Sequence, residues 1–75
     1  MLYLLQVDVM GGGWQTQLES RNYEEIARRQ AVARLMPMTA TRVVVKCQHC
    51  NEEVDIIQLS EFDNPNRCPN CHQTW

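Results

Sequence analysis

The chain reads Cys47-Gln48-His49-Cys50 near its middle and Cys68-Pro69-Asn70-Cys71 near its end. Each Cys-x-x-Cys turn lets the backbone curl so that both sulfurs approach one ion at about 2.3 Å. Residues 51–67 separate the two pairs by seventeen positions, a spacing typical of four-cysteine zinc sites. The pattern therefore predicts one zinc ion per chain, bound by Cys47, Cys50, Cys68 and Cys71.

The start of the chain bears on whether these cysteines bind metal or form disulfides. The apolar residues 1–5 have no basic residue before them and are followed by Gln6 and Asp8, which fits neither a signal peptide nor a membrane span. We therefore expect a cytoplasmic protein. Disulfides do not persist in the cytoplasm, so paired cysteines there are more often metal ligands.

The predicted metal site is expected to be structural. Four thiolates complete a tetrahedron, whereas a catalytic zinc keeps three protein ligands and an open position. His49 and His72 could each replace a cysteine as a ligand, and the sequence leaves this open. A redox role for one pair is a further alternative, but Pro69 does not favour the strand-to-helix context of redox pairs. No catalytic triad, carboxylate pair or phosphate loop stands out, so enzyme activity is not expected.

Residues 45–75 resemble the zinc-ribbon family, whose members hold one zinc between two cysteine turns, or knuckles, at the end of a short antiparallel sheet. Family members usually have glycine after the second cysteine of each knuckle, where the backbone needs a positive φ. This chain has Asn51 and His72 at those places. Both residue types are enriched at positive φ, so the resemblance implies a left-handed backbone at both positions.

The front half of the chain reads as a hairpin followed by a helix. Alternating apolar residues predict strands at 5–9 and 14–19, joined by the glycines 11–13. Asn22 and Glu25 have the spacing of a capping box, and residues 23–36 contain no glycine or proline before Pro37. We expect this helix to pack through a ridge made of Tyr23, Ala27, Ala31 and Leu35.

The back half continues with strands. Residues 42–46 surround three valines and predict a buried strand, and residues 53–59 predict a strand of the ribbon, followed by a return loop through residues 63–66. The fold class is then α+β: a three-stranded sheet with one helix, in the order β-β-α-β, continues into a C-terminal zinc ribbon. Residues 1–45 and 46–75 form the two parts of one compact unit.

The sequence also predicts where the aromatic residues and two of the methionines lie. Trp14 and Tyr23 are expected in the core, and Trp75 is expected to pack back over the ribbon. Met36 and Met38 flank Pro37 and read either as adaptable contact residues or as filler.

The charge distribution indicates the class of partner. Residues 46–75 carry five carboxylates against Lys46 and Arg67, a net charge of −3, whereas residues 1–45 carry five arginines and four carboxylates, a net of +1. Such an acidic ribbon repels a phosphate backbone. Arg28, Arg29 and Arg34 spread around the helix instead of forming one stripe.

A protein partner is therefore expected. Small acidic chains with a zinc ribbon resemble regulators or adaptors that dock on machinery such as RNA polymerase, and the size is similar to that of phage-encoded proteins acting on a host. The expected contact includes the acidic side chains Glu53 and Asp55, which would share one face of their strand. The alternative is a nucleic-acid-binding ribbon that uses the front-half arginines, and the third is a redox or metal-handling protein.

Overall fold

The computed structural model describes residues 1–62 and 65–75. Along the chain it contains β1 (Leu2–Val9), β2 (Gln15–Ser20), α1 (Tyr23–Ala33), β3 (Thr39–Lys46), β4 (Glu53–Asp55) and α2 (Ile56–Leu59). The α+β class predicted from the sequence is confirmed. The first half of the predicted return loop at 63–66 lies outside the described residues.

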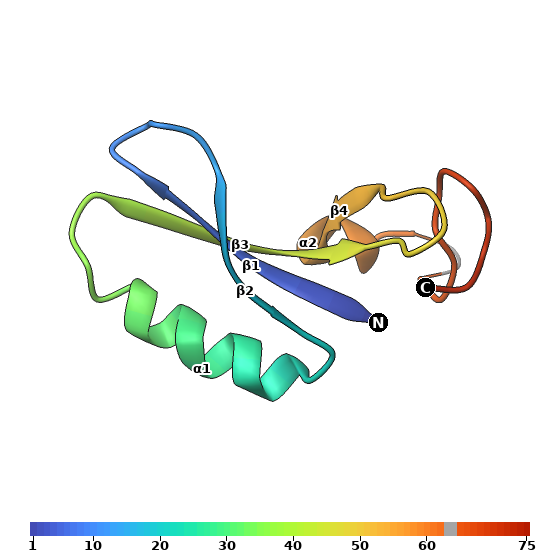
Figure 1. Ribbon diagram of the computed structural model, residues 1–75, viewed down its shortest axis with the longest axis horizontal. Coiled ribbons are helices and arrows are strands. Elements are labelled where there is room, and N and C mark those ends of the chain that lie inside the picture. Colours follow the sequence, from blue (N-terminus) through green and yellow to red (C-terminus); the bar gives the residue numbers. More distant parts are fainter. Residues whose placement is uncertain (63–64) are drawn as a thin grey trace.

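The sheet has four strands in the order β2-β1-β3-β4, and neighbouring strands are antiparallel. The predicted three-stranded sheet was therefore one strand short. The added strand comes from the segment assigned to the ribbon, because Val54 pairs with Val45 and joins β4 to the edge of β3. The ribbon segment thus continues the front sheet directly (Figure 1).

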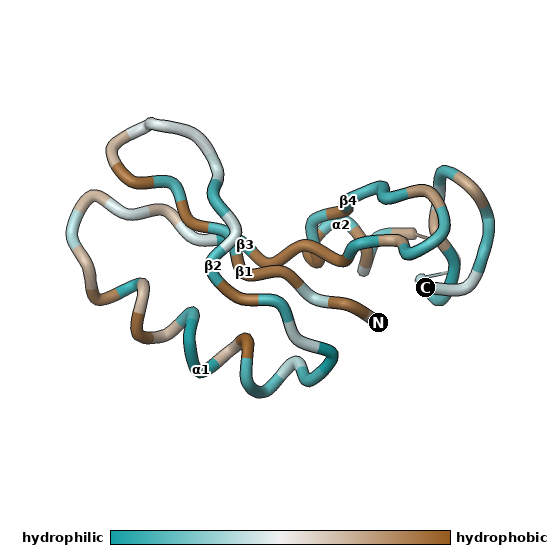
Figure 2. The backbone as a smooth tube through the Cα atoms, viewed as in Figure 1, coloured by the Kyte–Doolittle hydropathy of each residue, from teal (hydrophilic) through white to brown (hydrophobic). Residues whose placement is uncertain are grey.

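Both helices pack on one face of this sheet. Leu5 and Val43 are cross-strand partners, and with Ile26 of α1 they form a buried cluster that Ile56 of α2 also contacts. A second cluster, Val45, Val54 and Leu59, lies toward the cysteines. Figure 2 shows apolar residues concentrated along β1 and β3, the two central strands of the sheet. The molecule is elongated, with extents of 37 × 24 × 21 Å.

The helix α1 differs from the prediction in its length and in its buried face. Asn22 caps it as expected, because its side chain accepts a hydrogen bond from the Glu24 N–H at 3.0 Å. The predicted capping box does not form directly, since the Asn22 N–H donates to the Ser20 hydroxyl, which in turn donates to Glu25. Its buried residues are Ile26 and Ala33, while Leu35 of the predicted ridge is 84% exposed. The helix ends at Ala33, and bonds between residues three apart then tighten the chain into turns before Pro37.

The predicted strand at 53–59 is also wrong beyond its first three residues. Asp55 ends β4 in an extended conformation, and its side chain accepts a hydrogen bond from the Ile57 N–H at 2.9 Å. This N-cap starts the short helix α2 at Ile56, although isoleucine favours strands. Local capping therefore outweighs strand propensity at this place.

Trp14 and Tyr23 are not in the core, contrary to the prediction. Leu5 of β1 pairs with Leu18 of β2, but the next residue, Gln6, pairs with Thr16. The side chains of β2 therefore change faces at this bulge. Trp14 is 41% exposed, and the Arg42 guanidinium lies 4.3 Å from the centre of its ring. Tyr23 is 44% exposed and meets the ring of Tyr3 edge-on at 5.4 Å.

Candidate metal centre

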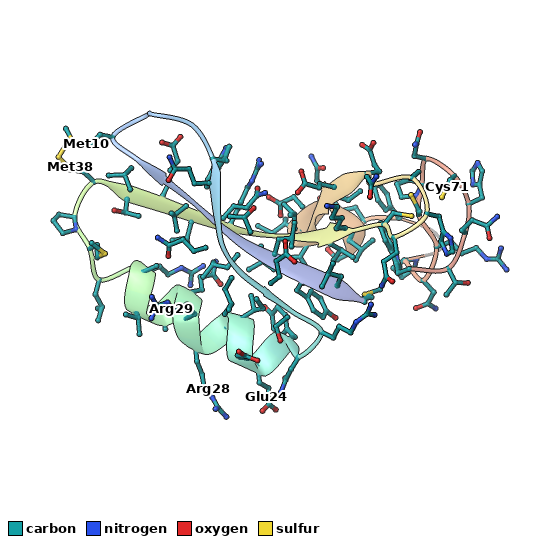
Figure 3. The ribbon with its side chains drawn as sticks, viewed as in Figure 1. Met10, Glu24, Arg28, Arg29, Met38 and Cys71 are labelled. Carbon is teal, nitrogen blue, oxygen red and sulfur yellow. The ribbon has the colours of Figure 1, made fainter. Side chains whose placement is uncertain are left out.

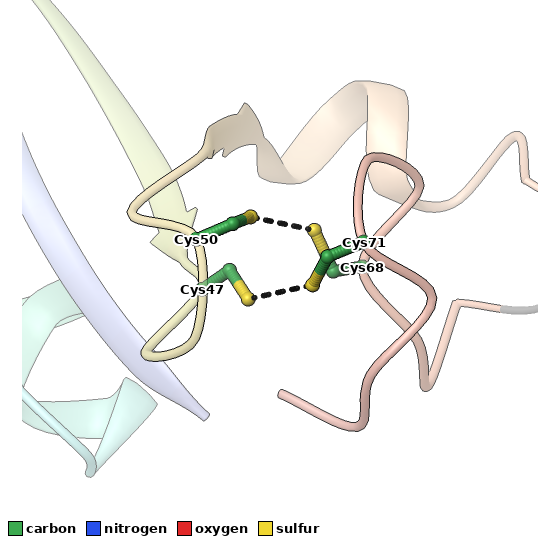
Figure 4. Close-up of side chains that lie close together, drawn as sticks. All are labelled: Cys47, Cys50, Cys68 and Cys71. Atoms are coloured by element: carbon green, nitrogen blue, oxygen red, sulfur yellow. Dashed lines mark hydrogen bonds between the residues drawn. The ribbon is translucent and has the colours of Figure 1, made fainter.

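The four cysteines predicted as ligands come together at one end of the molecule. Their Sγ atoms all lie within 4.8 Å of one another. The distances Cys47–Cys71 and Cys50–Cys68 are both 3.5 Å (Figure 4). A tetrahedral metal with bonds of about 2.3 Å separates its sulfurs by about 3.8 Å. The arrangement fits one metal ion, and the sulfur distances are far longer than a disulfide bond of about 2.05 Å.

The two knuckles, residues 47–51 and 68–72, share the same backbone hydrogen bonds. Asn51 N–H donates to the Cys47 carbonyl and His72 N–H donates to the Cys68 carbonyl, each at 2.9 Å. The first cysteine of each knuckle then donates its own N–H, Cys47 to Glu52 and Cys68 to Gln73, each at 2.8 Å. Two segments 21 residues apart in the sequence therefore adopt one local fold.

Each knuckle also contains the left-handed residue that the zinc-ribbon resemblance implied. Asn51 has a φ of 62° and His72 has a φ of 64°. The expectation for these two positions is confirmed. Asn and His replace the usual glycine at little steric strain, since both types are enriched in this region of backbone space.

The site combines buried and accessible sulfurs. The first cysteine of each knuckle, Cys47 or Cys68, is fully buried, whereas Cys50 and Cys71 are partly exposed. Trp75 packs beside the second apolar cluster, as expected, and its indole N–H donates to the Pro65 carbonyl at 2.7 Å. This contact ties the end of the chain to the segment before the second knuckle.

Hydrogen bonds and burial shift the pKa values of Cys50 and Cys71 in opposite directions. The Asn70 side chain, followed by the backbone of Glu52, lowers the pKa of Cys50 to about 6. At Cys71 a hydrogen bond with the Gln73 backbone acts in the same direction, but burial and the three neighbouring cysteines raise the pKa to about 12. Because the pKa of Cys71 is raised, ionising this thiol near neutral pH requires a cation among the sulfurs.

Neither histidine joins the sulfur cluster. Among the described residues, the group whose ligand atoms converge consists of the four cysteines alone. His49 contributes its backbone N–H, which lies 3.4 Å from the Cys47 sulfur, and both histidine side chains are exposed. The candidate ligand set in the described residues is therefore four sulfurs.

Sequence reasoning missed the residues that support the knuckles. Asn70 hydrogen-bonds the Cys50 sulfur, and the Arg67 guanidinium donates to the His72 carbonyl at 3.2 Å. Both residues are next to a cysteine in the sequence, which is the one signal that could have suggested their role.

The acidic side chains expected to form a docking face have structural partners. Glu53 accepts a hydrogen bond from Gln6 at 3.3 Å, and Asp55 caps α2. Of the helix arginines, Arg28 lies 3.8 Å from Glu24, with both side chains highly exposed (Figure 3). Arg29 and Arg34 form no ion pair with any residue that the structure describes.

Comparisons with family models, curated proteins and solved structures found no match to this chain. Among the described residues, no helix is long and apolar enough to cross a membrane.

Proposed function

We propose that this protein is a non-enzymatic zinc-ribbon protein that holds one structural zinc ion and acts by binding another protein. The convergence of four cysteine sulfurs within 4.8 Å supports this most directly. A metal held by four thiolates has no open coordination position for a substrate or a water molecule. Activity would then arise from the shape and charge of the surface.

A tetrahedral set of four thiolates suits zinc or iron. We propose zinc because the spacing of the two cysteine pairs is typical of zinc sites. Iron would make the protein coloured and redox-active, whereas zinc would not. Elemental analysis of purified protein should give one zinc per chain. A result of no metal, iron, or two metals per chain would refute this part of the proposal.

Charge favours a protein partner over nucleic acid. Residues 46–75 carry a net charge of −3, and four thiolates around a divalent ion add a further formal −2. The feature that best suits nucleic acid is the pair of exposed Trp14 and half-buried Arg42 on the sheet face away from the helices. Arg42, however, already donates at 2.7 Å to Gln6, which in turn donates to Glu53.

The test begins with affinity capture from a lysate of the cells that produce the protein, followed by mass spectrometry. The captured protein is then purified, and its binding to the zinc-loaded chain is measured directly. We expect capture to survive nuclease treatment. Capture that disappears with nuclease, or sub-micromolar duplex DNA binding that weakens steeply with salt, would favour the nucleic-acid alternative.

A further inference from the structure

Exposed apolar side chains gather at the end of the molecule opposite the cysteines. They come from the end of β1, the end of α1 and the loop before β3, and their exposed fractions lie between 53% and 84%. We call this surface the methionine tip; it consists of Val9, Met10, Val32, Leu35, Met36 and Met38. It holds three of the four methionines in the chain, and Figure 3 shows Met10 and Met38 side by side at the far end.

Two of these methionines have an unfavourable backbone. Met10 has a φ of 57° and Met38 has a φ of 60°, and the Met10 N–H donates to the Met38 carbonyl at 3.1 Å. A left-handed backbone is uncommon for a bulky residue, whereas glycine or asparagine adopts it readily. Core packing does not explain methionine here, because the two residues are 73% and 71% exposed. Strain held at an exposed surface points to a function of that surface.

A groove of about 130 Å³ runs beside the tip. Val9, Val32 and Met36 line it together with Arg29, which is the charged residue of its lining. The volume is close to the cavity of about 150 Å³ that accepts a benzene-sized group. The groove can therefore hold one apolar side chain.

We propose that the methionine tip docks a short amphipathic segment of a partner protein, in which apolar side chains are flanked by carboxylates. This inference rests on the proposed function, and it names the docking site and the chemistry of the partner. Methionine side chains are flexible and adapt to irregular apolar surfaces. An apolar side chain of the partner fills the groove and covers the methionines.

Charge complementarity selects carboxylates as the flanking groups. Arg29 borders the groove, whereas Arg34 lines a separate pocket beside Asp55 and Ile56. Arg29 forms no ion pair within the described part of the chain, so it can meet a carboxylate of a partner. The acidic residues 46–75 would repel the same segment from the metal end. A second copy is a poorer occupant, because a two-fold contact through the tip brings Arg29 of both copies together.

The test is selection from a displayed library of random peptides of about 12 residues, enough for three helical turns. The zinc-loaded protein and its double variant Met10→Asn with Met38→Asn serve as parallel targets. Asparagine tolerates the left-handed backbone, so the variant should keep its zinc and at least its thermal stability. Ile57→Gln is the matched control, because Ile57 is 72% exposed but lies in α2.

We expect selected peptides to carry apolar residues at helical spacing next to Asp or Glu. They should bind the double variant at least about tenfold more weakly, a change of about 1.4 kcal/mol, and bind Ile57→Gln as they bind the wild type. Arg29→Glu should shift the selection toward peptides with Lys or Arg. With ¹³C-labelled methionine methyl groups, the peptide should move the signals of Met10, Met36 and Met38. The signal of Met1, which packs beside the second apolar cluster, should stay in place.

Other outcomes overturn the inference. The inference is wrong if the selected peptides lack carboxylates, if they bind both targets equally, or if they move mainly the Met1 signal. Self-association that the double variant abolishes would assign the tip to a second copy, and binding to phosphatidylglycerol vesicles without peptide binding would assign it to a membrane. If a captured partner binds the double variant normally, the protein-binding function stands and this docking site fails. If neither selection nor capture gives a protein ligand, both proposals fail.

Discussion

Asn51 and His72 have the same left-handed backbone, with φ of 62° and 64°, at equivalent positions of the two knuckles. Each follows the second cysteine of its pair, and each N–H donates to the carbonyl of the first cysteine at 2.9 Å. The hydrogen bond closes the turn that directs both sulfurs of a pair toward the other knuckle. The geometry of the sulfurs therefore depends on two residues that are not ligands.

Asn51→Val or His72→Val should weaken both folding and zinc binding. A β-branched residue at positive φ is strained by about 1–3 kcal/mol, and that strain opposes closure of the knuckle. Glycine at either position should be tolerated, since it has no Cβ to clash. Thermal unfolding and competition with a chromophoric chelator measure the two effects.

Gln48→Val is the control for these variants, because Gln48 lies in the first knuckle but is not among the residues with positive φ. It should stay close to the wild type in both measurements. Valine variants at 51 and 72 that match Gln48→Val would show that the left-handed backbone is unimportant for the site.

Removal of the metal should unfold at least residues 46–75. Without the ion no bond holds the two knuckles together, and Trp75, which packs beside the cluster of Val45, Val54 and Leu59, loses its position. Amide NMR spectra before and after chelation measure the change residue by residue. The cluster of Leu5, Ile26 and Val43 contacts neither knuckle and should lose the least structure. Unchanged spectra after complete removal of the metal would show that the ion is dispensable.

The candidate metal centre was predictable because it depends on local spacing. Two Cys-x-x-Cys pairs and the residue types at 51 and 72 indicate the candidate ligands and the knuckle backbone without knowledge of the rest of the fold. The start of α1 was predictable for the same reason, since the Asn22 cap is a contact between residues two apart.

The predictions from sequence were wrong where the local structure depends on distant residues or on a single hydrogen bond. The bulge opposite Leu5 and Gln6 places Thr16 and Leu18 on different faces, and simple alternation cannot reveal it. Strand β4 exists because β3 offers it an edge, and the Asp55 cap then turns the chain into α2. The buried face of α1 follows the position of Leu5 and Val43, which lie on other elements.

Zinc affinity should fall as the pH is lowered, because protons compete with the metal for the thiolates. The pKa of Cys71 is raised to about 12, so its proton must leave on binding at every pH near neutrality. Affinity should therefore drop by at least about tenfold per pH unit. Below about pH 6 the drop should become steeper, because Cys50, whose pKa is lowered to about 6, then also takes up a proton. Chelator competition from pH 5 to pH 8 checks the slope, and an affinity independent of pH would contradict it.

Asp55 is expected to affect stability through its cap and partner binding through its charge, and two substitutions separate these effects. Its Oδ1 accepts the Ile57 N–H at 2.9 Å at the start of α2. Asp55→Ala removes the cap and should lower the free energy of unfolding by about 1 kcal/mol, which is about 4–8 °C in Tm for a domain of this size. Asp55→Asn keeps a good capping residue and removes the charge, so its Tm should stay near that of the wild type. If the acidic strand β4, which carries Glu53 and Asp55, steers a basic partner, Asp55→Asn should slow association at low salt and have little effect at high salt. An Asp55→Ala protein as stable as the wild type would show that the cap contributes nothing to stability. An unchanged association rate for Asp55→Asn would exclude the acidic strand as a docking face and leave the methionine tip as the proposed contact.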